Sequence, residues 1–77
     1  MEKDKILKII GKRIKQVRES KGFSQLELVG KMLGDIDPTN ISRIESGRTN
    51  PTIYTLYRIA EALEVSLEEL VSIEISN

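Results

Sequence analysis

The sequence predicts an all-α protein, a single compact domain of five short helices over residues 1–77. Three observations favour this class. Apolar residues recur at helical spacing in several short segments, a serine, threonine or aspartate precedes most of these segments, and glycines follow several of them. We expect the core to span about residues 10–71 and residues 72–77 to form a C-terminal tail.

The first predicted helix runs from Asp4 to Lys21, and Gly22 stops it. Its apolar positions at helical spacing are Leu7, Ile10, Ile14 and Val17. Gly11 lies inside this helix and costs about 1 kcal/mol relative to alanine, so we expect the segment before it to fray.

The second predicted helix begins with a capping box. Ser24 is the N-cap, Glu27 follows three residues later, and Phe23 and Leu28 stand at the positions of a hydrophobic staple. We expect this helix to end at Gly34.

The third predicted helix begins at Asp37 and Pro38, because proline at the first helical position gives up no needed hydrogen bond. Ile36 and Ile41 fit a second staple, and Gly47 ends the helix after about nine residues.

Thr52 caps the fourth predicted helix, and Ser66 with Glu69 forms a capping box for the fifth, stapled by Val65 and Leu70. The predicted buried face of the fourth helix is Ile53, Leu56, Ala60 and Leu63. The final "SIEISN" alternates apolar and polar residues, which predicts a short strand or an ordered extension.

Composition excludes several functions. The chain has no cysteine and no histidine, so it has no disulfide, no thiolate metal site and no histidine base or ligand. No serine has a base to activate it, so we expect no enzyme activity, no cofactor, no metal and no small-molecule effector. No apolar run approaches the roughly 20 residues that span a membrane, and no signal-peptide pattern opens the chain, so we expect a cytoplasmic protein.

The net charge is zero, but the charges are segregated along the chain. Residues 1–22 contain eight Lys or Arg and three acids, whereas residues 51–77 contain one Arg and five Glu. A solvated face and a surface for a polyanion are both compatible with the basic segment.

The third predicted helix has an unusual outer face. Ile41 and Ile44 define its buried direction on a helical wheel, and Asn40 and Glu45 fall on the flanks. The opposite face carries Thr39, Ser42, Arg43 and Ser46. Short side chains let a helix approach a surface closely, the major groove of DNA admits one helix, and Arg can bind guanine with two hydrogen bonds. The pattern therefore predicts a helix that enters the major groove.

Two flanking segments are suited to phosphate. Gln25 lies in the first turn of the second helix, where free N–H groups and the helix dipole favour an anion. Arg48, Thr49 and Asn50 precede the start of the fourth helix, which offers a similar site.

These segments resemble the Cro/repressor-type (XRE-type) helix-turn-helix family from about Ile10 to Leu70. The resemblance rests on "GKRIKQVRESKGFSQLEL", "ISRIESGRTNPT" and "LYRIAEALEVSLEEL" in this order and spacing. It implies a five-helix, lambda-repressor-like DNA-binding fold, usually dimeric, in which the second and third helices form the helix-turn-helix.

The resemblance also implies roles for individual residues. Arg18 is expected to bridge to Glu45, and Gln25 to contact phosphate. By the same resemblance Thr39, Asn40, Ser42 and Arg43 face the DNA. From their positions beside these residues, Pro38, Arg48, Thr49 and Asn50 are also expected at the DNA. The chain departs from the family pattern in one place, because about three extra residues lie between Gln25 and Ile41. The small residue between the two helices is either Val29 or Gly30.

Each assignment has a plainer alternative. Arg18 and Glu45 would be ordinary solvated charges, Gln25 a good helix former, and Arg48 a charge that favours a helix C-terminus. The apolar C-terminal group is a dimer contact or part of the core; it comprises Leu67, Leu70, Val71, Ile73 and Ile75.

The sequence thus predicts a sequence-specific regulator of transcription that binds double-stranded DNA, as a dimeric repressor or controller on a palindromic operator. The alternative is a protein-interaction module or antitoxin component with the same fold, which zero net charge favours. Salt dependence separates the two, because phosphate contacts weaken steeply with salt.

Overall fold

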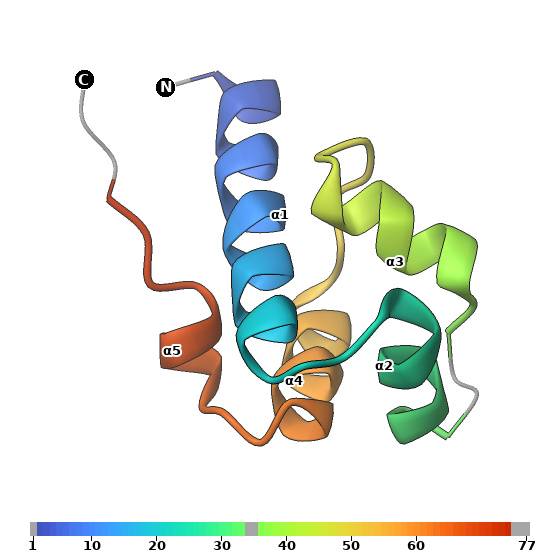
Figure 1. The fold of residues 1–77 in the computed structure, drawn as a ribbon. Helices are drawn as coiled ribbons and strands as arrows, with labels where there is room; N and C mark the ends of the chain where they lie inside the picture. The colour runs from blue at the N-terminus through green and yellow to red at the C-terminus, as the bar shows by residue number, and fades with distance from the viewer. Residues whose placement is uncertain (1, 34–35, 75–77) are drawn as a thin grey trace.

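The computed structural model describes residues 2–33 and 36–74. Within these residues the chain forms α1 (Lys3–Ser20), α2 (Gln25–Lys31), α3 (Pro38–Glu45), α4 (Ile53–Ala62) and α5 (Leu67–Leu70) (Figure 1). The all-α class with five helices is confirmed.

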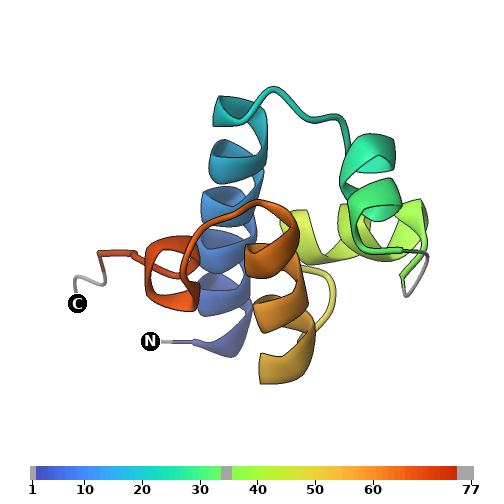
Figure 2. The same cartoon turned by 90° about the horizontal axis from the view of Figure 1, so that it is seen from below.

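The helices pack around one core. α1 packs against α3 and α5, α2 against α3 and α4, and α4 against α5. Figures 1 and 2 both place α5 on one side of α1 and the α2–α3 pair on the other. The surface of α3 and the surface of α5 therefore face away from each other.

The core takes side chains from every helix. Ile41 and Ile44 of α3 are both buried, as their spacing predicts. The buried apolar residues are Ile14, Val17, Leu28, Met32, Ile41, Ile44, Ile59, Ala60, Leu63 and Leu70. Arg13 adds a polar link, since its Nε and Nη2 donate to the Glu69 carbonyl at 3.1 and 2.8 Å and so join α5 to α1.

The predicted N-caps of α2, α3 and α4 are confirmed. Ser24 Oγ accepts from the Glu27 N–H and Glu27 Oε1 accepts from the Ser24 N–H, both at 3.0 Å, which completes the capping box. The Asp37 side chain accepts from the Asn40 N–H at the start of α3, and the Thr52 side chain accepts from the Thr55 N–H at the start of α4. These caps satisfy N–H groups that a helix leaves without partners.

α5 has only half of its predicted capping box. Ser66 Oγ accepts from the Glu69 N–H at 3.0 Å, but the reciprocal bond to the Ser66 N–H is not formed. Of the two forms predicted for the tail, a strand is excluded at residues 72–74 and an extension without a strand is found there; the rest of the prediction falls on residues outside the described part of the chain.

The end of α2 was predicted too late. The helix ends at Lys31 with Met32 as its C-cap, and Gly34 lies outside the described residues. Leu33 has a φ of 57°, which is the left-handed conformation that glycine most often adopts after the end of a helix. The chain thus leaves the helix one residue before the glycine that marked its end in the sequence.

The predicted buried face of α4 is confirmed at Ala60 and Leu63, with Leu56 partly buried against the core, and it is wrong at Ile53. Ile53 is 74% exposed, whereas Ile59, Ala60 and Leu63 are buried. The first turn of α4 extends beyond the neighbouring helices, so its helical spacing alone does not bury Ile53.

α1 continues without a break through Gly11. A Cβ built on Gly11 would overlap the Ile44 carbonyl oxygen and lie 2.6 Å from the Glu45 carbonyl oxygen. The glycine therefore allows α1 to touch the C-terminal end of α3. The sequence predicted only that Gly11 lowers the stability of the helix, and the contact with α3 was not predicted.

Candidate DNA-binding surface

The outer face of α3 is open to solvent along its length. Ile41 and Ile44 hold the helix to the core, and the side chains around them are exposed. The exposed residues on α3 and its C-cap are Pro38, Thr39, Asn40, Ser42, Arg43 and Ser46. Except for Arg43 they are short, so the helix backbone can come close to a bound surface.

A buried ion pair fixes the C-terminal end of α3. Arg18 Nε donates to Glu45 Oε2 at 2.7 Å and Arg18 Nη2 donates to Glu45 Oε1 at 3.0 Å, a two-point contact between side chains that are 8% and 3% exposed. Arg18 Nη1 also donates to the Phe23 carbonyl at 2.6 Å. The structure thus contains the pair implied by the resemblance, and it excludes the solvated alternative for these two residues.

The hydrogen bond with Glu45 raises the pKa of Arg18 above its ordinary value, against the opposing effect of burial. Arg18 is therefore charged wherever the protein is folded. The two-point contact fixes the orientation of α3 on α1, because charge-assisted hydrogen bonds are directional, whereas an apolar contact would let the two helices shift relative to each other.

Gln25 belongs to the same network. Its Nε2 donates to Glu45 Oε1 at 3.0 Å, and the residue is half-buried. This bond was not expected, because Gln25 was assigned to phosphate alone. An amide nitrogen carries two hydrogens, so one donor stays available for a phosphate oxygen at the start of α2.

The segment after α3 turns sharply toward α1. Gly47 has a φ of 76°, and the Arg48 N–H donates to the Arg43 carbonyl at 2.9 Å. Arg48 and Asn50 are exposed and Thr49 is half-buried. This turn and the first turns of α1 line one open hollow, which comprises Lys3, Asp4, Leu7, Lys8, Gly47, Arg48, Thr49 and Asn50.

The longer connection between α2 and α3 does not displace the start of α3. Asp37 Oδ1 accepts from the Asn40 N–H at 2.8 Å, and Pro38 is the first helical residue. Between the two candidates for the small residue, Val29 packs against the core, whereas a Cβ on Gly30 would meet nothing within 4 Å. Val29 therefore fills the space between the helices.

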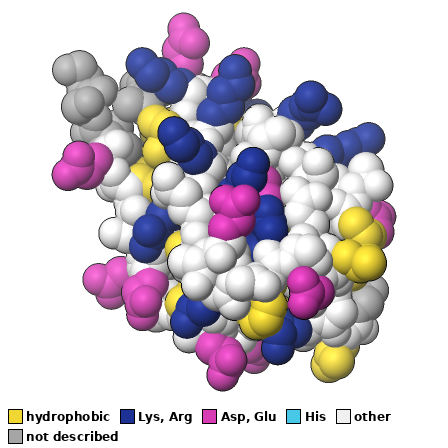
Figure 3. Space-filling view, in the orientation of Figure 1, with side chains coloured by type: hydrophobic (Ala, Val, Ile, Leu, Met, Phe, Trp, Pro, Cys, Tyr) yellow, Lys and Arg dark blue, Asp and Glu magenta, His cyan; other side chains and the backbone are white. Residues whose placement is uncertain are grey.

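Charge on this side of the molecule is uneven. In Figure 3 the Lys and Arg side chains gather over the upper part of the face, along α1 and outward to α3, while acidic side chains are more frequent toward α5 and the lower edge. The chain has zero net charge, but the surface around α3 is the basic one.

The C-terminal apolar group divides between core and surface. Leu70 is fully buried within the monomer, so it has no side-chain surface for a second copy, and its assignment to an interface is corrected. Leu67, Val71 and Ile73 are half-buried on the α5 side, and Ile75 lies outside the described residues.

Two properties of the described residues bear on other functions. No helix in them is both long and apolar enough to cross a membrane. They contain no group of three or more acidic, histidine or cysteine side chains arranged to hold a metal ion.

Comparison with known proteins decides the family. The model of the helix-turn-helix family HTH_3 matches residues 14–70, which is most of the described core. The chain belongs to this family of DNA-binding transcriptional regulators.

Curated relatives agree with this helix-turn-helix assignment. An uncharacterised HTH-type transcriptional regulator of Sinorhizobium fredii, y4dJ, is 38% identical over 65 residues, which cover 84% of this chain and 82% of the relative. The HTH-type transcriptional regulator SinR of Bacillus subtilis is 40% identical over 63 residues, covering 80% of this chain but 55% of SinR. Both relatives are named as regulators of transcription.

Solved structures show the same helix-turn-helix fold. The restriction-modification controller protein C.AhdI of Aeromonas hydrophila has a TM-score of 0.84 at 26% identity, covering 91% of this chain and 99% of that one. An HTH_3 family transcriptional regulator of Vibrio cholerae has a TM-score of 0.82 at 27% identity, covering 92% of this chain and 39% of that one.

Two residues that build the helix-turn-helix surface were missed in the sequence. Gly11 allows the close approach of α1 and α3, and the Phe23 carbonyl accepts from Arg18. Gly11 lies seven residues before Arg18 and so on the same face of the helix, which is the signal that could have identified it. The Phe23 contact is made by a backbone carbonyl, which every residue has, so the sequence gives no signal for it.

Proposed function

We propose that this chain binds double-stranded DNA as a homodimer on a palindromic operator and so controls transcription in a sequence-specific manner. The observation that carries the proposal is the outer face of α3, where Thr39, Ser42 and Arg43 are exposed on a helix fixed by buried isoleucines and by the Arg18–Glu45 pair. The controller and regulator names among its relatives support the same reading.

The proposed roles follow from position. α3 enters the major groove, where Thr39, Asn40, Ser42 and Arg43 lie nearest to base edges and Pro38 lies at its leading end. Phosphates are contacted by the second Nε2 donor of Gln25 and by the turn that contains Arg48, Thr49 and Asn50.

The proposed dimer uses the α5 side. Leu67, Val71 and Ile73 are half-buried there, on the side of α1 away from α3 (Figure 1). Half-sites one turn of DNA apart need α3 helices about 34 Å apart. The molecule measures 37 × 21 × 20 Å. If two copies pair through their α5 sides, each α3 lies on the outer side of its copy, so the two α3 helices are separated by more than one and less than two of the shorter widths. A separation of about 34 Å falls within this range. Sedimentation should show a dimer at micromolar concentration, and monomers both free and on DNA would contradict it.

Arg43 and Arg48 test the proposal because they are assigned different contacts. An operator is first selected from a random duplex library, and each alanine variant is then titrated with operator and scrambled DNA over a series of salt concentrations. Loss of a base contact through Arg43→Ala should cost about 1–3 kcal/mol on the operator and much less on scrambled DNA. Loss of a phosphate contact through Arg48→Ala should weaken both DNAs alike and reduce the salt slope by about one.

Equal weakening of both DNAs by Arg43→Ala would show that α3 does not read bases through this residue. Absence of any salt-dependent DNA binding would favour the alternative, a protein-interaction module or antitoxin component. One structural observation favours that alternative: Ile53, Tyr54 and Tyr57 on α4 are 74%, 66% and 50% exposed.

A further inference from the structure

Four lysines form one continuous face of α1. Lys5, Lys8, Lys12 and Lys15 follow one another at intervals of three, four and three residues, and all four are exposed. At 100° per residue they fall within a sector of about 80°. We refer to these four residues as the lysine face.

The lysine face has no partner in the part of the chain that the structure describes. Among residues 2–33 and 36–74 none of the four side chains takes part in a hydrogen bond or an ion pair, whereas Arg13 and Arg18 of the same helix are bound to α5 and α3. Two acids of α1 adjoin the face: Asp4 in the first turn, where a carboxylate also favours the helix N-terminus, and Glu19 one turn after Lys15.

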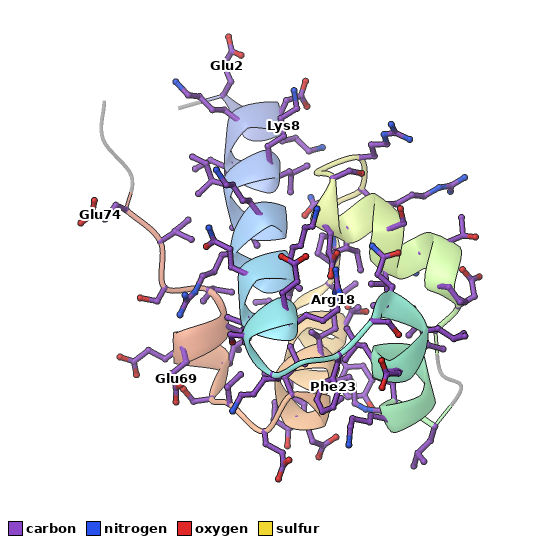
Figure 4. All side chains as sticks on the ribbon, viewed as in Figure 1. Glu2, Lys8, Arg18, Phe23, Glu69 and Glu74 are labelled. Carbon is purple, nitrogen blue, oxygen red and sulfur yellow. The ribbon has the colours of Figure 1, made fainter. Side chains whose placement is uncertain are left out.

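The lysine face adjoins the proposed DNA-binding surface. A Cβ built on Gly47 would lie 2.7–2.8 Å from atoms of Lys8, so the turn after α3 rests directly on α1 at this residue. Figure 4 shows Lys8 on the part of α1 beside that turn. Lys12 and Lys15 follow Gly11, the residue at which α1 touches the end of α3. The face therefore runs from the Arg48 turn past the C-terminal end of α3.

Its length suits a nucleic-acid backbone. From Lys5 to Lys15 the helix rises about 15 Å, comparable with the rise along the duplex axis over about four phosphates of one DNA strand. A face that was merely solvated would usually mix acids with lysines, whereas no acid lies between Lys5 and Lys15 on α1.

We propose that the lysine face is a second phosphate-binding surface, which binds the DNA backbone outside the base pairs that α3 contacts. The inference rests on the proposed DNA binding and extends its footprint beyond the helix-turn-helix. It assigns these four residues to affinity and not to the choice of sequence, because phosphates carry no base identity.

The test compares two duplexes, one trimmed to the selected operator and one with flanking base pairs on both sides. Lys8→Gln and the fourfold Lys5→Gln/Lys8→Gln/Lys12→Gln/Lys15→Gln variant are titrated with each duplex over a salt series. Lysine and glutamine have similar helix propensities, so the exposed substitutions leave the fold intact, which circular dichroism checks. Lys21→Gln is the matched control, because Lys21 is exposed at the end of α1 and lies off the lysine face.

On the flanked duplex, Lys8→Gln should weaken binding several-fold and lower the salt slope by about 0.9 for each protomer bound, and the fourfold variant by up to about four times as much. On the trimmed duplex both variants should bind as the wild type does. Lys8→Arg should keep the wild-type slope, Lys21→Gln should change nothing, and Asp4→Asn should strengthen binding to the flanked duplex. The ratio of operator to scrambled affinity should not change.

The inference fails if the fourfold variant binds the flanked duplex with the affinity and salt slope of the wild type while Arg48→Ala still weakens it. That result would leave the proposed function standing. Equal losses on trimmed and flanked duplexes would also overturn it, because the lysines would then not act on flanking phosphates. If the wild-type protein binds neither duplex, the proposed DNA binding is wrong, and this inference, which rests on it, is wrong as well.

Discussion

Removal of the Glu45 carboxylate should destabilise the whole domain, because three helices depend on it. Glu45→Ala deletes two hydrogen bonds from Arg18 and one from Gln25, and it leaves the Arg18 guanidinium in a site where the side chain is 8% exposed. One contact of Arg18 remains, the bond from Nη1 to the Phe23 carbonyl. Breaking a buried pair by removing one partner costs about 3–5 kcal/mol. The total stability expected for 77 residues is roughly 4–12 kcal/mol, so the loss is a large fraction of it.

The assay is urea denaturation followed by circular dichroism, applied to a double-mutant cycle. Arg18→Ala leaves the Glu45 carboxylate buried without its charge partner, so each single variant carries a penalty that the double variant lacks. We expect the double variant to lose less than the sum of the singles, by about 0.5–3 kcal/mol. Gln25→Ala should cost about 1 kcal/mol in the wild type and close to nothing once Glu45 is alanine. If Glu45→Ala does not fold, Glu45→Gln in the same cycle keeps the side-chain volume and removes only the charge.

Additive losses from Arg18→Ala and Glu45→Ala would show that the two side chains do not stabilise each other. An undiminished effect of Gln25→Ala in the Glu45→Ala background would remove Gln25 from the network.

Two further predictions concern the helix caps. The hydrogen bonds from Ser24 lower the pKa of Glu27 in the folded protein, so Glu27 contributes stability above its unfolded pKa of about 4.3, and this contribution is lost as the pH falls through the lower folded value. In thermal unfolding over an acid pH series, the melting temperature of Glu27→Gln should therefore fall less steeply with decreasing pH than that of the wild type, because glutamine keeps the capping bond but does not titrate. Equal slopes for the two proteins would show that the capping bonds of Glu27 do not contribute to the pH dependence. Asp37→Ala removes the cap at the start of α3 and should cost about 1 kcal/mol, whereas Asp37→Asn should cost less; urea denaturation of the two variants checks this order.

Caps could be read from the sequence because each is local. Ser24, Asp37 and Thr52 bind N–H groups three residues away, so the spacing that identifies them is also the spacing that makes the bond. Ile41 and Ile44 were identified as buried for a similar reason, since both lie on one stripe of a short helix whose other positions are polar.

Features that depend on a distant neighbour were not accessible in this way. Ile53 has the spacing of a buried residue, but no helix covers the first turn of α4. Gln25 donates to a carboxylate twenty residues away, on a helix whose orientation the sequence does not specify. The resemblance supplied the Arg18–Glu45 pair only because the family pattern already contains the tertiary contact.

Gly11 and Gly30 show this difference most directly, because helix propensity alone treats them alike. Both lie inside helices, where glycine costs about 1 kcal/mol relative to alanine, so propensity alone predicts that alanine stabilises at either position. In the structure a Cβ at Gly30 meets open space, whereas a Cβ at Gly11 would overlap backbone oxygens of Ile44 and Glu45, which no side-chain movement relieves. Gly30→Ala should therefore stabilise the domain by up to about 1 kcal/mol. Gly11→Ala should destabilise it by about 1–3 kcal/mol, because α1 and α3 must separate.

Urea midpoints of the two variants measure the difference, and operator binding should follow it. Gly11→Ala displaces the end of α3 that Glu45 fixes on Arg18, so it should weaken DNA binding even under conditions where the variant is fully folded. Gly30→Ala touches nothing and should bind as the wild type does. A stabilised Gly11→Ala variant would mean that α1 and α3 do not meet at this glycine, and the position of α3 on the domain would then need a different explanation.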